Sequence, residues 1–156
     1  MEMNSMLNEN YLKYREKFLN YTNTDMNLEL ENDSQIYIAV FDLPFDDKAA
    51  GGNTWTLALA FGLNTHLYFG DGSVLVDLEK NTEVMQAMQS LFISAPQVLD
   101  KMKLTDDVSF YESKNVRAYL KTRKGVYYSE LTDKTSEERF LAMLINNVMD
   151  SITKSV

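Results

Sequence analysis

Few residues in this chain could carry out chemistry at a catalytic or metal site. Histidine occurs once, as His66, and cysteine does not occur. Zinc sites built from cysteine and histidine therefore cannot be assembled. A cysteine–histidine nucleophilic pair is excluded, and a serine–histidine–aspartate triad would depend wholly on His66. Because no partner motif points to this histidine, we interpret it as a structural or simply exposed side chain.

The carboxylates are the other possible ligands for a metal ion. Asp42, Asp46 and Asp47, with Asp71 and Asp77, could supply oxygen atoms to a hard cation. Their spacing does not match the calcium-binding pattern Asp-x-Asp-x-Asp-Gly, so we expect a solvated acidic surface instead. We predict no catalytic residue, no metal and no cofactor. A carboxylate-based, metal-dependent enzyme stays open as an alternative, because pocket carboxylates can be scattered along a sequence.

A basic strand is predicted between Val116 and Arg123. The alternation of a strand places Arg117, Tyr119 and Lys121 on one face. Basic residues interleaved with tyrosine can stack and pair with nucleic acid. The net charge of −8 repels phosphate backbones, so we expect no nucleic-acid partner. We interpret this face as a surface strand, or as a site for an acidic peptide or a neighbouring acidic surface.

The charge is unevenly distributed along the chain. Seven acidic residues and no lysine or arginine lie between Phe18 and Asp47, whereas residues 114–124 carry five bases and no acid. The two segments either face each other across the fold or form two different surfaces. The acidity itself serves solubility, or it attracts a basic protein partner.

Three helices are predicted from apolar residues at three- and four-residue steps. The first covers about residues 5–21 and the second begins near Thr82. Pro96 interrupts the second helix, and residues 94–97 fit a capping box, so we expect a kink or restart there. The third helix begins with a capping box at residues 135–138 and extends to about Ile152.

Strands are predicted between the helices, at residues 36–41, 54–61, 66–69, 73–76, 116–122 and 126–131, with a short one at 108–111. The run at 36–41 is apolar enough to be buried on both sides. The alternation at 54–61 is typical of a half-covered strand. Gly70-Asp71-Gly72 predicts a hairpin turn, since no helix follows it to bind phosphate. Arg123-Lys124-Gly125 predicts a second tight turn.

This order of elements predicts one α+β domain over residues 1–156. An antiparallel sheet of about five to seven strands would be packed by the N-terminal, the kinked middle and the C-terminal helices. No apolar run approaches the roughly 18 residues of a membrane span, so we expect no membrane partner. The N-terminal residues are polar and acidic, and we expect no signal peptide. The lack of cysteine suits a reducing cytoplasm, where we expect the protein.

The stretch from Thr54 to Tyr128 resembles a group of small uncharacterised bacterial proteins. The matching pieces are Gly52-Asn53-Thr54, Leu67-Tyr68-Phe69 before a glycine turn, and Val116-Arg117-Ala118-Tyr119 leading to Gly125-Val126-Tyr127. In that group the turn is usually richer in glycine than it is here. The resemblance implies no known activity.

The predicted order of elements is also similar to the type III secretion chaperone fold, although no residue motif carries this likeness. It implies a non-enzymatic protein, commonly dimeric, that binds an extended segment of a client. In that interpretation the client would meet the sheet, and the dimer would form through a helix.

We predict a non-catalytic protein-binding protein from the charge, the supply of nine tyrosines and the missing catalytic residues. Its expected form is an immunity-type or inhibitor protein for a basic toxin or effector. The expected partner-binding residues are Asp42, Asp46, Asp47, Arg117, Tyr119 and Lys121. The chaperone-like protein and the metal-dependent enzyme are the alternatives, and a homodimer is considered possible.

Overall fold

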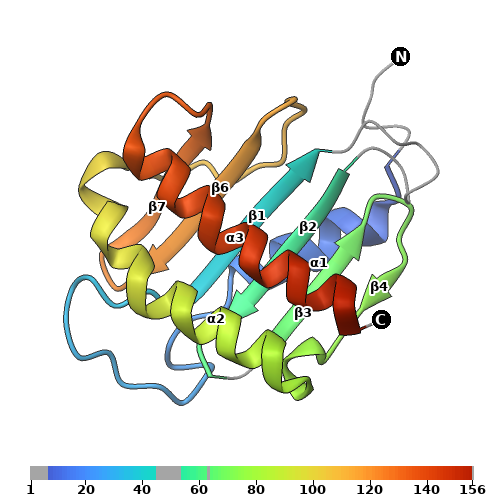
Figure 1. Ribbon diagram of the computed structural model, residues 1–156, viewed down its shortest axis with the longest axis horizontal. Coiled ribbons are helices and arrows are strands. Elements are labelled where there is room, and N and C mark those ends of the chain that lie inside the picture. Colours follow the sequence, from blue (N-terminus) through green and yellow to red (C-terminus); the bar gives the residue numbers. More distant parts are fainter. Residues whose placement is uncertain (1–6, 45–53, 63, 156) are drawn as a thin grey trace.

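An antiparallel sheet of seven strands forms the centre of the fold, in the order β4-β3-β2-β1-β6-β7-β5 (Figure 1). The computed structural model describes residues 7–44, 54–62 and 64–155. The strands are β1 Ile38–Pro44, β2 Thr54–Ala60, β3 Asn64–Phe69, β4 Val74–Leu75, β5 Lys103–Thr105, β6 Val116–Thr122 and β7 Gly125–Leu131. The helices are α1 Glu9–Leu19, α2 Thr82–Ser94 and α3 Ser136–Ser155, with short 3₁₀ helices η2 Leu78–Lys80 and η3 Ala95–Lys101. The α+β class and the sheet with its three packed helices are confirmed.

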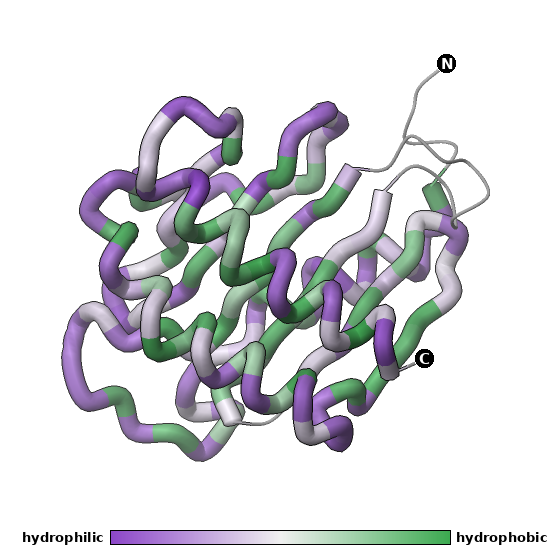
Figure 2. Tube along the Cα trace, viewed as in Figure 1, coloured by the Kyte–Doolittle hydropathy of each residue, from purple (hydrophilic) through white to green (hydrophobic). Residues whose placement is uncertain are grey.

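The sheet is covered on both faces. Helices α2 and α3 lie side by side over one face, and α1 packs on the other against β1, β2 and β3 (Figure 1). Hydrophobic residues run along the central strands (Figure 2), and successive residues alternate between the two cores. Phe41 and Leu57 belong to the core under α2 and α3, whereas Val40 and Ala58 belong to the core under α1. The interpretation of β2 as half-covered is therefore wrong, because α1 and the chain that follows it cover the second face.

The two predicted hairpin turns are present. β6 and β7 pair through Thr122 and Gly125, which leaves a two-residue loop, and Gly125 takes a positive φ of 133°. β3 and β4 are joined by the four residues 70–73, in which Gly72 has φ 94°. A Cβ atom at Gly72 would lie 2.6 Å from the side chain of Asn8. This close approach places the start of α1 against the β3–β4 turn.

The helix ends follow local hydrogen bonds. Asn8 caps α1 by accepting from the amide of Asn10, so the helix begins at Glu9 instead of near residue 5. α2 ends at Ser94, as expected from Pro96, and continues directly as η3. Ser94 makes no side-chain capping bond, so the capping box predicted there is not formed. At α3 the Thr135 hydroxyl accepts from the amide of Glu138 at 3.1 Å, which is half of the predicted box.

The short strand predicted at residues 108–111 is not formed. The seventh strand is β5 instead, which pairs with β7 at the edge of the sheet. Val108 and Phe110 pack against the core under α1. Their alternating apolar pattern therefore belongs to a segment without strand structure that lies across the sheet face under α1. We call this segment, residues 106–115, the covering segment.

Candidate functional site

Three of the predicted partner-binding residues are enclosed by the fold. Asp42 and Arg117 are 0% exposed and Tyr119 is 1% exposed. They lie on the face of the sheet that carries α1, and Asp42 and Arg117 are paired neighbours on β1 and β6. The expectation of a surface strand is wrong for Arg117 and Tyr119, and Asp42 lies on no acidic surface, because α1 and the covering segment lie over them. Asp46 and Asp47 lie outside the described residues.

The Asp42 carboxylate is fully engaged within the protein. Arg15 of α1 donates from Nε to Oδ1 at 3.0 Å and from Nη2 to Oδ2 at 2.8 Å, a two-pronged ion pair. Thr56 donates its hydroxyl to Oδ1 at 2.7 Å, and the Tyr11 hydroxyl contacts Thr56 Oγ1 at 2.6 Å. Burial opposes the charge of Arg15, but Asp42 outweighs burial, so the pKa of Arg15 is raised. This carboxylate joins α1 to the sheet.

Arg117 holds the covering segment to the sheet. Its guanidinium donates to the backbone carbonyls of Tyr111 at 2.9 Å, Ser113 at 3.1 Å and Asn115 at 2.7 Å. Phe110 stacks against the guanidinium carbons of Arg15 and Arg117, at 5.7 and 5.5 Å from its ring centre. Within the described part of the chain, Nε of Arg117 is the one buried side-chain nitrogen or oxygen that lacks a hydrogen-bond partner. The arrangement is that of a structural clamp.

Glu130 extends the row of charges from β6 to β7. It is the paired neighbour of Arg117, and its carboxylate accepts from Ser113 Oγ at 2.6 Å and Asn115 Nδ2 at 2.9 Å. The Tyr111 hydroxyl donates a third hydrogen bond at 2.7 Å. The hydrogen bonds from Ser113 and Asn115 lower the pKa of Glu130 to about 2. Glu130 therefore fastens the same segment that Arg117 holds.

We predict that Glu130 makes the protein less stable in acid. Its pKa is lowered on folding from an ordinary value of 4.5 to about 2, so its stabilising effect is complete above the ordinary value. The effect is lost as the pH falls through that interval. Urea unfolding followed at several pH values should therefore show a smaller acid loss of stability in Glu130→Gln than in the wild type. Glu112→Gln is the control, and an equal change in both variants would contradict the prediction.

Lys121 is partly buried and is also occupied. Its ammonium donates to the carbonyls of Leu19 at 2.7 Å and Tyr21 at 2.6 Å, which caps the C-terminal end of α1. Burial lowers the pKa of Lys121. Arg117, Tyr119 and Lys121 do share one face, as their spacing predicts, but all three are occupied by contacts within the protein.

His66 has a structural environment. Its Nδ1 accepts from the amide of Asp77 at 3.2 Å, and its ring lies edge-on to Phe18 with centres 5.9 Å apart. Among the described residues, no three histidine, aspartate or glutamate side chains gather so that they could hold a metal ion. A search of the same residues found no helix of the length and apolarity that crossing a membrane requires.

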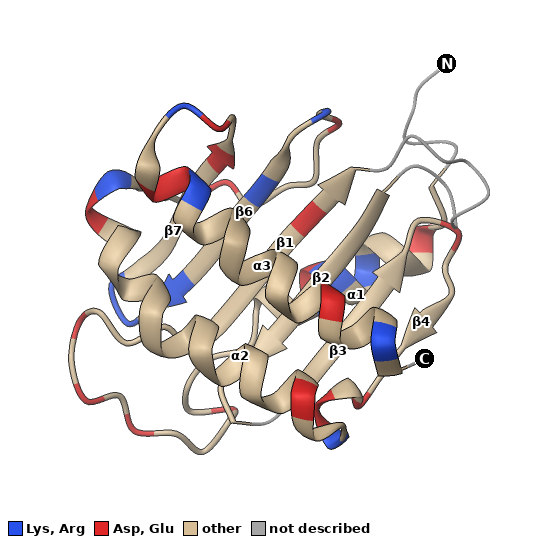
Figure 3. Cartoon of the chain, in the orientation of Figure 1, with Lys and Arg blue, Asp and Glu red and all other residues tan. Residues whose placement is uncertain are grey.

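The acidic and basic segments of the sequence meet in part. Arg123 Nε lies 2.7 Å from Asp33 Oδ1 on the surface, which joins the β6–β7 turn to the acidic loop that precedes β1. Asp42 is the one acidic residue of β1 and is the paired neighbour of Arg117 on β6. Figure 3 shows the acidic band on β1 and basic bands on β6. Two further acids of the loop, Glu29 and Glu31, have no cation partner within the part of the chain that the structure describes.

Glu29 and Glu31 line a groove of about 360 Å³ on the surface. Its apolar lining comes from three places in the chain, with Leu28 and Ile36 in the loop, Phe61 after β2, and Phe92 and Pro96 at the junction of α2 and η3. We call this the acidic groove. Both glutamates are exposed and Ile36 is buried, so the groove combines exposed carboxylates with an apolar lining.

Comparisons with known proteins place this chain in no group. No family model, no curated protein and no solved structure matches it. The resemblances to the uncharacterised bacterial group and to the secretion chaperone fold therefore stay predictions. The function rests on the geometry described above.

Proposed function

We propose that this protein is a non-catalytic protein-binding protein of the immunity or inhibitor type, which holds a basic toxin or effector in the acidic groove. The observation that carries the proposal is that two exposed carboxylates, Glu29 and Glu31, which have no cation partner among the described residues, lie beside an apolar lining. The groove replaces Asp42 as the expected contact, since Asp42 is enclosed with Arg15.

The chemistry of the acidic groove favours lysine or arginine side chains from a partner. Their aliphatic stems can pack on Phe61 and Phe92, while their charged ends reach Glu29 and Glu31. The net charge of −8 would steer such a partner at long range. A cytoplasmic location belongs to the proposal and is supported by the absence of cysteine.

The two alternatives lack a comparable feature. A chaperone of the secretion type would meet its client on the sheet, but helices and the covering segment lie over both faces of the described strands. A metal-dependent enzyme would need a cluster of carboxylates, and the described residues form none. The acidic groove is the feature that points to a partner of definite chemistry.

The test compares two variants that lose the same charge. The tagged chain captures its partner from its own cells, and the purified partner is then titrated against Glu29→Gln/Glu31→Gln and against the control Glu112→Gln/Asp150→Asn. We expect the first variant to bind about ten-fold or more weakly, with a shallower dependence on salt. The control should bind like the wild type after correction for net charge. Equal weakening in both variants, or a partner without a basic surface, would overturn the proposal.

A further inference from the structure

A second surface of definite character lies between α1 and the β3–β4 edge of the sheet. It is a groove of about 310 Å³ lined mainly by Tyr14, Tyr21, Tyr68, Val74 and Val76, and we call it the tyrosine groove. Among the described residues, eight large apolar or aromatic side chains are exposed, and four of them line this groove. Such a concentration of exposed apolar side chains is typical of an interaction surface.

The backbone beside the tyrosine groove has hydrogen-bonding groups that no described residue uses. The amide of Phe69 donates to Ser73 across the turn, and Leu75 pairs with Leu67. In an antiparallel ladder the hydrogen-bonded positions alternate, so the backbone groups of Val74 point away from β3, and an extension of β4 by one residue would give those of Val76 the same direction. β4 ends the sheet. The side chain of Val74 lies on the same face as Tyr68, its paired neighbour.

The two edges of the sheet differ in their protection. β5 carries Lys103, and Lys101, Asp106 and Asp107 flank it. Charges of this kind discourage pairing with another strand. The run Val74-Leu75-Val76 has no charge and no proline. Asp77 follows this run directly, so the uncharged part of the edge at β4 is three residues long. A further strand can pair there, whereas the strand at the other edge itself carries a charge.

The charges around the tyrosine groove indicate which molecule supplies the additional strand. Among the described residues, no carboxylate lines the groove and one lysine, Lys17, does, although the whole chain carries a net charge of −8. Two copies of an acidic protein repel each other over most of their surface, but the lining of this groove would bring no carboxylate into the contact. We propose that the occupant is a second copy of this chain, which adds its β4 strand antiparallel to the first.

A two-fold axis perpendicular to the sheet lets both copies make the same backbone hydrogen bonds. It places Val74 of one copy opposite Val76 of the other, so that their outward-pointing backbone groups pair twice. The axis keeps both tyrosine grooves on the same side of the joined sheet. A stable interface buries about 800 Å² on each partner, which a strand of two residues does not supply. Tyr14 and Tyr21 must therefore contribute to the contact.

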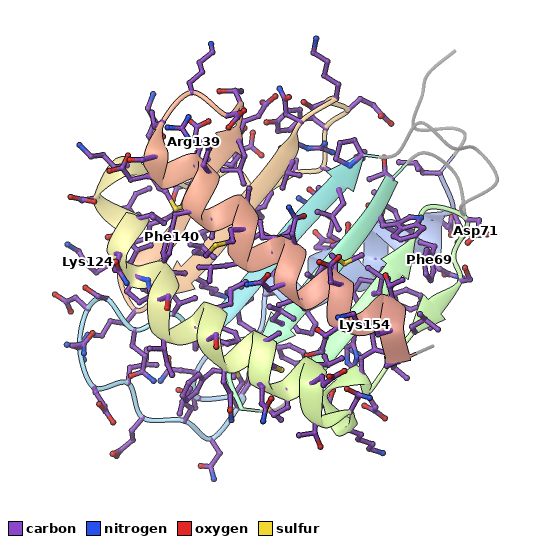
Figure 4. All side chains as sticks on the ribbon, in the orientation of Figure 1. Phe69, Asp71, Lys124, Arg139, Phe140 and Lys154 are labelled. Atoms are coloured by element: carbon purple, nitrogen blue, oxygen red, sulfur yellow. The ribbon has the colours of Figure 1, made fainter. Side chains whose placement is uncertain are left out.

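The proposed dimer contact and the acidic groove are separate surfaces. The acidic loop and β4 lie at opposite sides of the molecule (Figure 1). Figure 4 shows the same separation through Asp71 in the β3–β4 turn and Lys124 in the β6–β7 turn. A dimer through β4 therefore leaves the acidic groove free. Glu29→Gln/Glu31→Gln should dimerise like the wild type, so the two proposals can fail separately.

The test uses a matched pair of edge variants of the full chain. Val76 and Leu104 are both 52% exposed, one beside β4 and one in β5. Sedimentation over a wide concentration range should show a dimer for the wild type and for Leu104→Lys. We expect Val76→Lys to dimerise about ten-fold or more weakly, because each copy would bring an unpaired charge into the contact. Circular dichroism checks that both variants fold.

Tyr14→Ser provides a second variant that leaves the strand unchanged. It should also weaken the dimer, since the tyrosines supply contact area that β4 lacks. A wild-type chain that stays monomeric at every concentration would overturn the proposal. So would a dimer that tolerates Val76→Lys, or one that Leu104→Lys disrupts equally.

Discussion

Replacement of Arg15 by methionine is expected to lower the free energy of unfolding by about 3–5 kcal/mol. The variant keeps much of the aliphatic volume of the side chain but removes the cation. Asp42, which is 0% exposed, would lose its ion-pair partner, and among the described residues the Thr56 hydroxyl would be its one remaining hydrogen-bond donor. Urea unfolding followed by circular dichroism measures the loss.

Two further variants test whether the loss of stability comes from breaking the buried ion pair between Arg15 and Asp42. Arg123→Met breaks the ion pair with Asp33, whose two side chains are 47% and 63% exposed, and it should change stability little. Adding Asp42→Asn to Arg15→Met removes the negative charge of the buried carboxylate and should restore part of the lost free energy of unfolding. A cost for Arg15→Met no greater than that for Arg123→Met would show that the pair between Arg15 and Asp42 is not shielded from water.

The central strands and the long helices could be predicted because their signals are local. β1 begins with the continuous apolar run of residues 38–41 and is buried on both faces. In β2 the alternation of Leu57 and Leu59 with Ala58 and Ala60 separates the two cores correctly. Of the two edge strands, β4 is predicted through its hairpin turn, whereas β5 at Lys103–Thr105 is too short for a local signal and is not predicted.

The burial of the predicted site residues could not be found in the same way. Alternation in β6 shows that Arg117 and Tyr119 share a face, but it does not show what covers that face. The cover comes from distant segments, since Arg15 of α1 also donates to the carbonyl of Val108 in the covering segment at 2.7 Å. Contacts over such sequence separations leave no periodic pattern.

One signal in the sequence did point to the buried ion pair. Arg15 lies four residues after Tyr11 and three before Phe18, so it falls on the apolar stripe of the first helix. A charge in that position must be paired when the stripe is buried. The isolated Asp42 in the apolar strand 38–44 is the matching acid. The acidic groove gave no such signal, because Phe61 and Phe92 join it only in the folded chain.

Replacement of Arg117 by methionine is expected to release the covering segment and to lower the free energy of unfolding by about 2–4 kcal/mol. The three carbonyls of Tyr111, Ser113 and Asn115 would lose their shared donor. Hydrogen–deuterium exchange should therefore quicken in residues 108–115 at conditions where the amides of β1 and β2 stay protected.

Arg117→Lys separates the charge from the geometry of this contact. Lysine keeps the positive charge between Asp42 and Glu130 in the row across the sheet, but one ammonium cannot reproduce the planar fork that spans three carbonyls. We therefore expect exchange in residues 108–115 to quicken in both variants, and stability to fall further in Arg117→Met. If Arg117→Met lowers stability while exchange in that segment keeps its wild-type rate, Arg117 serves as a counter-charge and not as a clamp. Glu130, with its hydrogen bonds to Ser113 and Asn115, would then be what holds the covering segment in place.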